Sequence, residues 1–238
     1  MKSQRGVTLV ELIIAMAVTT LVLGSVYLAV NSTQRHSAAI EGKVVAQQDV
    51  KAALDLMALE ISMASYNPGF ASDIWRTAND CNTAGVNEYR GIQEATANAL
   101  TVEMDLDGDG DTTGTNEKIR YSYIATADGD RYIARAVGCG GGFTAFLGDK
   151  LADGRPLNVR VVNGDYNPVI PVFRYFNGSG TEIPVDGTAD GLPAKTADIR
   201  RIVITLAVET EHIDPNTGQR KRLIYSISVI PRNHVISQ

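Results

Sequence analysis

Hydrophobic positions divide the chain into one unbroken apolar segment, an amphipathic segment and a region of short alternating runs. From Val7 to Val30 the sequence reads VTLVELIIAMAVTTLVLGSVYLAV, 24 residues in which Glu11 is the only side chain charged at neutral pH. As a helix, this segment is long enough to cross the roughly 30 Å hydrocarbon core of a bilayer. The sequence therefore predicts a membrane-spanning helix over residues 7–30.

The helical pattern continues beyond the apolar segment. Over residues 31–66 apolar side chains recur at three- and four-residue spacing, which places them on one helix face. Asn67-Pro68-Gly69 then ends the pattern. We expect one continuous helix of roughly 60 residues, about 90 Å long at 1.5 Å per residue. Gly24 and Gly42 are its expected weak points, because glycine inside a helix costs up to about 1 kcal/mol relative to alanine.

Residues 67–238 have the pattern of a β-rich globular head. The runs ALTVEMDL, EKIRYSYIA and RYIARAV alternate between apolar and polar positions, which predicts an antiparallel meander. Near the C-terminus two alternating runs flank DPNTG, where Pro215 and Gly218 suit the turn of a hairpin. The expected fold class is α+β, with a long N-terminal helix packed on an antiparallel β-rich head.

Charge sets the expected orientation and narrows the function classes. Lys2 and Arg5 precede the apolar segment, so the positive-inside rule places the N-terminus in the cytoplasm and the head outside. A cleaved secretory signal is disfavoured, because the apolar run exceeds the roughly 7 to 15 residues of a signal's hydrophobic region. The formal net charge is -5, and without a basic cluster we expect no nucleic-acid partner.

The N-terminus resembles that of a type IV prepilin. In that family a short basic leader ends in glycine, a peptidase cuts after the glycine, the new first residue is N-methylated, and glutamate is the fifth residue of the mature chain. Gly6, Val7 and Glu11 match these positions, although Val7 replaces the usual phenylalanine. The resemblance implies a leader over residues 1–6, cleavage between Gly6 and Val7, and methylation of Val7.

The same resemblance gives Glu11 a role in assembly. It implies that the carboxylate pairs with the N-terminal amine of a neighbouring subunit. A charged side chain in a membrane helix costs about 2.5 to 3.5 kcal/mol on insertion scales, and an opposite charge nearby recovers part of that cost. The alternative is that Glu11 lies at the membrane interface, where it snorkels and has no role.

The C-terminal sequence is similar to the last hairpin of PilW-like minor pilins, which often end near a Pro-Arg-Asn such as Pro231-Arg232-Asn233. This implies a minor pilin of a type IV pilus, first in the inner membrane with a periplasmic head and later in the filament. The implied partners are other major and minor pilins, prepilin peptidase and the inner-membrane assembly platform. Two alternatives remain: a J-like pseudopilin of type II secretion, and a membrane-anchored module for calcium-dependent binding.

The two cysteines, Cys81 and Cys139, both lie in the exported part of the chain. In an oxidising compartment an even number of cysteines predicts one disulfide, and two free thiols are the alternative.

An acidic segment, DLDGDGDTTGTNE, suggests a metal site. Its start fits the D-x-[DN]-x-[DN]-G pattern of calcium loops, in which alternate side chains aim oxygen atoms at a hard cation. Its end departs from the pattern, because the glutamate comes one residue late, and strand-like runs flank it. We expect a calcium-binding hairpin loop, with a solvated acidic turn as the alternative. The expected oxygen donors are Asp105, Asp107, Asp109, Asp111 and either Asn116 or Glu117.

Catalytic motifs are not found in the sequence. His36, His212 and His234 are far apart, and neither H-E-x-x-H nor G-x-S-x-G occurs. We therefore expect a structural protein and not an enzyme.

Overall fold

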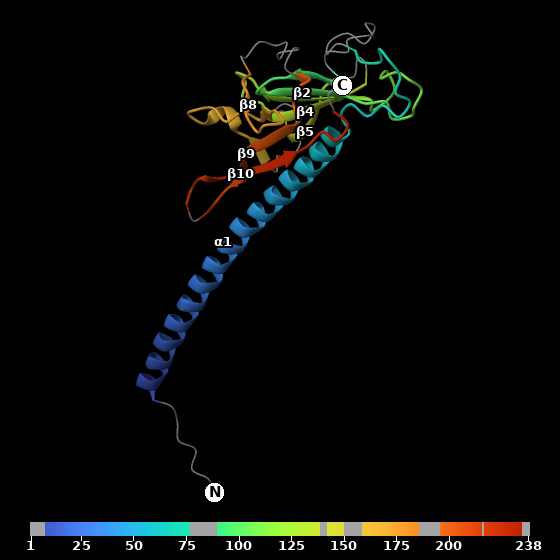
Figure 1. The fold of residues 1–238 in the computed structure, drawn as a ribbon. Coiled ribbons are helices and arrows are strands. Elements are labelled where there is room, and N and C mark those ends of the chain that lie inside the picture. Colours follow the sequence, from blue (N-terminus) through green and yellow to red (C-terminus); the bar gives the residue numbers. More distant parts are fainter. Residues whose placement is uncertain are drawn as a thin grey trace.

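The computed structural model describes residues 8–76, 90–138, 142–149, 159–185, 196–215 and 217–234. A long helix, α1 (Leu9–Ser62), projects from a β-rich head, and Leu9 lies at the end of the helix far from the head (Figure 1). At 1.5 Å per residue, its 54 residues span about 80 Å. The helix runs without a break through Gly24 and Gly42, the two positions where the sequence suggested weakness.

The helix ends four residues before the predicted end at Tyr66. Met63 is the C-cap, and Ser65 then takes a left-handed backbone conformation with φ of 66°. The backbone N–H of Ser65 donates to the carbonyl oxygen of Glu103 at 2.8 Å, so the chain leaves the helix to join the head. Non-glycine residues rarely adopt this conformation, and tertiary contacts stabilise it here.

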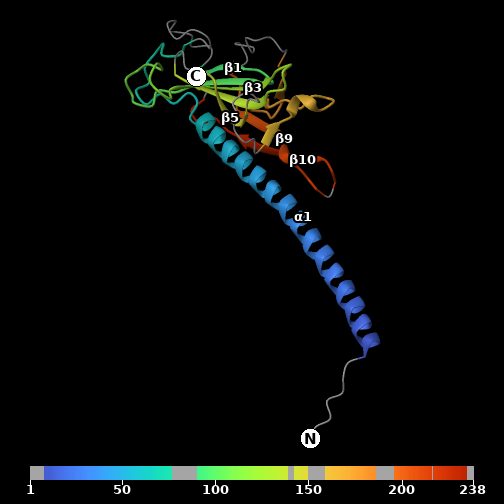
Figure 2. The same cartoon turned by 180° about the vertical axis from the view of Figure 1, so that it is seen from behind.

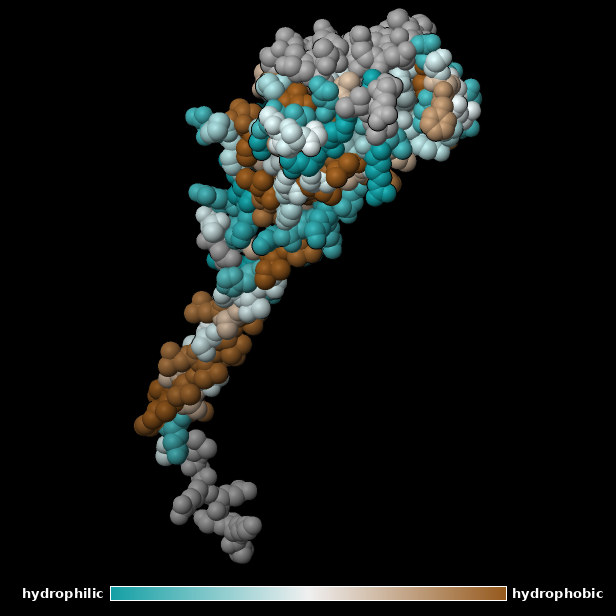
Figure 3. Space-filling view, viewed as in Figure 1, coloured by the Kyte–Doolittle hydropathy of each residue, from teal (hydrophilic) through white to brown (hydrophobic). Residues whose placement is uncertain are grey.

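The two halves of α1 have different surroundings. The apolar N-terminal half is exposed on all sides, and its most hydrophobic 18-residue window has mean hydropathy 2.3 with no buried residue. Figure 3 shows hydrophobic side chains along the visible face of this half and hydrophilic ones where the head begins. By length and composition the helix can cross a membrane. The buried residues all lie in the C-terminal half: Ala46, Val50, Ala53, Leu54, Met57, Glu60 and Ile61.

The first sheet of the head is the predicted antiparallel meander. Its strands follow one another in sequence order, each paired with the next. The alternating runs noted in the sequence form its central strands, which confirms that part of the prediction. The strands are β1 (Ile92–Ala95), β2 (Ala99–Glu103), β3 (Lys118–Ala125), β4 (Arg131–Val137) and β5 (Thr144–Asp149).

The second sheet contains the predicted C-terminal hairpin. Its order is β10-β9-β7-β8, and β6 also pairs with β9. The inner face of the hairpin is apolar, and Ile204 of β9 lies opposite Ile227 of β10. A short 3₁₀ helix, η2 (Asn163–Asp165), follows β6. The strands are β6 (Val159–Val161), β7 (Phe173–Phe176), β8 (Glu182–Ile183), β9 (Arg201–Ile213) and β10 (Arg220–Val229).

One core joins the helix to both sheets. Buried apolar side chains of α1 pack with those of both sheets in a single cluster. Figures 1 and 2 show the C-terminal half of α1 lying against the head. Within this interface the Glu60 carboxylate accepts hydrogen bonds from the Tyr121 hydroxyl and from the Arg135 guanidinium, with 2.5 Å between Glu60 Oε1 and Arg135 Nη2. These hydrogen bonds fix the rotation of α1 about its own axis relative to the first sheet, because their geometry is directional.

Candidate assembly and metal-binding sites

Glu11 caps the helix that carries it. Thr8 is the N-cap of α1, and its hydroxyl oxygen accepts a hydrogen bond from the Glu11 backbone N–H at 3.3 Å. In return, the Thr8 backbone N–H and hydroxyl donate to Glu11 Oε2 at 2.9 and 3.0 Å. This reciprocal arrangement is a capping box. One carboxylate oxygen is thus satisfied by the protein's own backbone, which lowers the cost of placing Glu11 in an apolar segment.

The sequence interpretation missed Thr8. The signal was present, because Thr-x-x-Glu before an apolar run is the sequence signature of a capping box. The predicted cleavage residues Gly6 and Val7 lie outside the described residues. Glu11 itself is exposed in the single chain, so its carboxylate is accessible to a charged group of another subunit.

Three of the predicted metal ligands lie together. One carboxylate oxygen from each of Asp105, Asp107 and Asp109 falls within a group 4.8 Å across. Asp105 is buried and accepts hydrogen bonds from the backbone N–H groups of Gly108 at 2.7 Å and Gly110 at 3.2 Å. Both glycines have φ near +80°, a conformation that side chains disfavour, so they allow the loop to curl around the Asp105 carboxylate.

The other predicted ligands point elsewhere. Asp111 accepts hydrogen bonds from the backbone N–H and hydroxyl of Thr113, and these lower the pKa of the Asp111 carboxyl. Glu117 is buried, and its carboxylate accepts backbone N–H bonds from Leu106 at 2.8 Å and Gly114 at 2.7 Å. Asn116 has φ of 68° and turns the chain into β3. The Glu117 carboxylate therefore holds the loop together by accepting hydrogen bonds from its backbone N–H groups.

The predicted disulfide partners, Cys81 and Cys139, lie outside the described residues.

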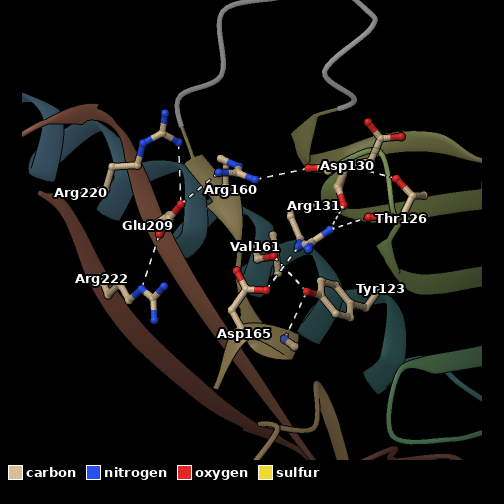
Figure 4. A network of polar contacts seen from close by, with 12 residues as sticks. Tyr123, Thr126, Asp130, Arg131, Arg160, Val161, Asp165, Glu209, Arg220 and Arg222 are labelled. Carbon is tan, nitrogen blue, oxygen red and sulfur yellow. Dashed lines mark hydrogen bonds and ion pairs between the residues drawn. The ribbon is translucent and has the colours of Figure 1, made fainter. Parts of the chain in front are cut away.

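A cluster of arginines surrounds Glu209 on the second sheet (Figure 4). The carboxylate of Glu209 pairs with Arg160 at 3.2 Å, Arg222 at 3.5 Å and Arg220 at 3.7 Å. These residues belong to no motif recognised in the sequence. Arg220 and Arg222 are adjacent in the hairpin, but Arg160 comes from β6 and joins them only because β6 pairs with β9.

The same network ties the two sheets together. Arg160 also donates to the Gly129 carbonyl oxygen at 3.3 Å, and Arg131 pairs with Asp165 of η2 at 3.4 Å. The Tyr123 hydroxyl donates to the Val161 carbonyl oxygen at 3.2 Å (Figure 4). These contacts link the β3–β4 hairpin to β6 and η2.

His234 fastens the end of the described chain to the end of α1. Its Nδ1 lies 2.7 Å from the Ser65 hydroxyl and 2.9 Å from the Arg90 carbonyl oxygen, and its Nε2 lies 2.8 Å from the Thr196 carbonyl oxygen. Burial lowers the pKa of the imidazole. Ser65 and His234 are both buried, so this serine–histidine pair serves packing and is closed to a substrate.

Comparison with known proteins finds a family match at the N-terminus. Residues 1–27 match the family described as the prokaryotic N-terminal methylation motif. A solved structure, a type IV-like pilin from Thermus thermophilus, is similar with a TM-score of 0.38 and 11% sequence identity, over 79% of this chain and 98% of that chain. No match was found among curated proteins. The methylation motif and the exposed apolar helix together fit a chain anchored in a membrane through its N-terminal helix.

Proposed function

We propose that this protein is a minor pilin of a type IV pilus. The observation that carries the proposal is the combination of the N-terminal methylation motif with an apolar helix that none of the described residues of the head covers. An exposed apolar helix is unstable in water, so it needs lipid before assembly and neighbouring helices afterwards. In this proposal prepilin peptidase cuts between Gly6 and Val7, Val7 is methylated, and the assembly platform transfers the chain from the inner membrane to the filament.

Glu11 directs the transfer. In the free subunit its carboxylate is held by Thr8 of the same chain. During assembly it pairs with the N-terminal amine of a neighbouring pilin, and the two charges compensate each other in a low-dielectric environment. The helix thereby gains a defined axial register in the filament, while the head forms the outer surface.

The minor role and the PilW-like assignment rest on the resemblance of the C-terminal hairpin. A J-like pseudopilin of type II secretion is the alternative, and it shares every N-terminal feature. Deletion of the gene distinguishes the minor pilin from the pseudopilin. Loss of pili with normal protein secretion supports the pilin assignment, and loss of secretion with normal pili supports the pseudopilin.

The experiment on Glu11 measures incorporation into sheared filaments. We expect Glu11→Gln to lower the amount in filaments by roughly tenfold or more, because breaking a buried charge pair costs several kcal/mol. Glu41→Gln is the matched control, since Glu41 is an exposed glutamate of the same helix beyond the apolar segment. Equal incorporation of the Glu11→Gln and wild-type chains would contradict the proposed pairing.

We further propose that the loop of Asp105, Asp107 and Asp109 binds calcium. The three clustered carboxylates support this, because Ca²⁺ prefers several oxygen ligands and relieves the repulsion among them. In this proposal Glu117 does not bind the ion. Its carboxylate holds the loop in shape through the hydrogen bonds from Leu106 and Gly114. A calcium-dependent binding module is the function that this site would serve if the helix were only a tether.

Calcium binding is measured on the detergent-solubilised full chain. At a calcium concentration 100 times the Kd, about 2.7 kcal/mol of stabilisation is expected, which raises Tm by about 5 to 10 °C. Asp107→Ala removes a clustered oxygen ligand and abolishes most of the shift. Asp128→Ala, in the exposed turn between β3 and β4, leaves the shift intact. If calcium produces neither binding heat nor a change in Tm, the loop is a solvated acidic turn.

A further inference from the structure

The β9–β10 hairpin is the part of the head that reaches furthest toward the apolar half of α1. Both views of the ribbon show its tip beside the middle of the helix, below the rest of the head (Figures 1 and 2). Ala46 is the first fully buried residue of α1, and it lies 16 residues after Val30, about 24 Å along the helix. In a chain anchored through residues 7–30, the hairpin is therefore the part of the head that faces the membrane surface.

The end of this hairpin next to its turn carries exposed cations. Lys221 and Arg222 are exposed, and the Arg222 side chain has 48% of its surface accessible. Arg160 and Arg220 lie beside them, and all three arginines share the single carboxylate of Glu209, whose side chain is only 10% accessible. The four cations stand against the buried Glu209 and, nearer the turn, Glu211 and Asp214, so the formal charge of this group is +1.

The tip of the hairpin adds an acid and an apolar side chain. Asp214 begins the turn and offsets one positive charge, and the side chain of Glu211 lies outside the described residues. Ile213 is 57% exposed, next to an open hollow of about 780 Å³ that Arg220, Lys221 and Arg222 line on one side. Cations beside an exposed aliphatic side chain are the composition of a surface that contacts lipid headgroups.

We propose that the β9–β10 hairpin docks on anionic phospholipid headgroups while the chain is anchored in the membrane. Lysine and arginine side chains near an anionic bilayer are attracted to its surface, and the attraction falls off within a Debye length. The contact holds the head against the membrane and is broken when the subunit is extracted. This inference rests on the membrane anchoring of the proposed function and adds a second point of attachment to it.

Hydrogen exchange of the full chain in vesicles tests the docking. The chain is reconstituted into phosphatidylcholine vesicles with and without phosphatidylglycerol, and exchange is followed over residues 213–222. We expect exchange in this segment to slow several-fold with the anionic lipid and to return to the phosphatidylcholine rate at high salt. Lys221→Gln/Arg222→Gln should lose the slowing, because two cations near the surface together contribute roughly tenfold or more to the docking equilibrium.

Arg174→Gln/Arg232→Gln is the control variant. It removes two charges from exposed positions outside the hairpin and should keep the slowing. Equal exchange in the two lipids overturns the docking. Slowing that appears in both lipids and grows with protein density also overturns it, because it assigns the hairpin to a neighbouring subunit. Co-flotation of the chain with vesicles reports anchoring separately, so a chain that fails to float contradicts the proposed function and not only the docking.

Discussion

At the scale of single residues, the buried carboxyl of Glu103 gives a pH-dependent stability. Burial raises its pKa to about 7, although the Arg76 backbone N–H and the Lys118 ammonium oppose the shift. The folded state therefore holds this proton more tightly than the unfolded state does. The stabilisation is complete below the unfolded value of 4.5 and is lost as pH rises through about 7.

Glu103→Gln should remove this dependence. Between pH 5 and pH 8 the wild-type chain is expected to lose about 2 to 3 kcal/mol through this group, and the variant should lose much less. Urea denaturation at the two pH values measures the difference. Glu182→Gln, an exposed glutamate of β8, serves as control. If wild type and Glu103→Gln have parallel pH profiles, Glu103 is ionised in the folded state throughout.

Residue roles that depend on a local motif could be predicted from the sequence. Glu11 was found because the motif around it is local, and Thr8 could have been found in the same way. The orientation of Glu117 was not accessible, because it depends on how the loop folds back onto the N–H groups of Leu106 and Gly114. The sequence pattern gives the possible ligands. The hydrogen bonds between these side chains and the backbone determine which carboxylates lie close enough together to bind one ion.

At the scale of elements, the contact of α1 with the first sheet depends on a buried ion pair. Glu60 is 7% exposed and has Arg135 and Tyr121 as partners. The raised pKa of Arg135, caused chiefly by its hydrogen bond to Glu60, agrees with a close pair. Removing one member leaves the other charge without compensation in the interface, which typically costs 3 to 5 kcal/mol.

Glu60→Ala is therefore expected to destabilise the head by about 3 to 5 kcal/mol in chemical denaturation. In the Arg135→Ala background the same change should cost clearly less, since the partner is already missing. Asp55→Ala is the control, because Asp55 is exposed on the same helix. Additive effects of the two alanine variants would show that the pair does not couple the helix to the sheet.

Elements with a regular local pattern were predicted, and those that depend on distant contacts were not. The helix, the meander and the β9–β10 hairpin follow from periodicity and turn residues. β6 and β8 contain only three and two residues, and they become strands by pairing with β9 and β7. The helix end was placed too late, because the left-handed turn at Ser65 is stabilised by Glu103 and His234, which no local pattern reveals.

At the scale of the whole molecule, the exposed apolar half of α1 extends from a folded head. The sequence predicted this division, since an apolar run of membrane length is recognisable without tertiary contacts. It did not predict the cationic surface that faces the apolar half of the helix, because Arg160 is far in sequence from Arg220 and Arg222. The formal net charge of -5 describes the whole chain and gives no sign of this local group of cations.

The central claim is that the chain enters the pilin pathway, and its processing tests the claim most directly. Intact mass and N-terminal sequencing should be carried out on the membrane-extracted protein from cells with and without prepilin peptidase. We expect a chain that begins with N-methylated Val7 only when the peptidase is present, and a chain that keeps residues 1–6 when it is absent. A chain that keeps residues 1–6 in both strains, or one cut beyond Val30, would contradict entry into the pilin pathway.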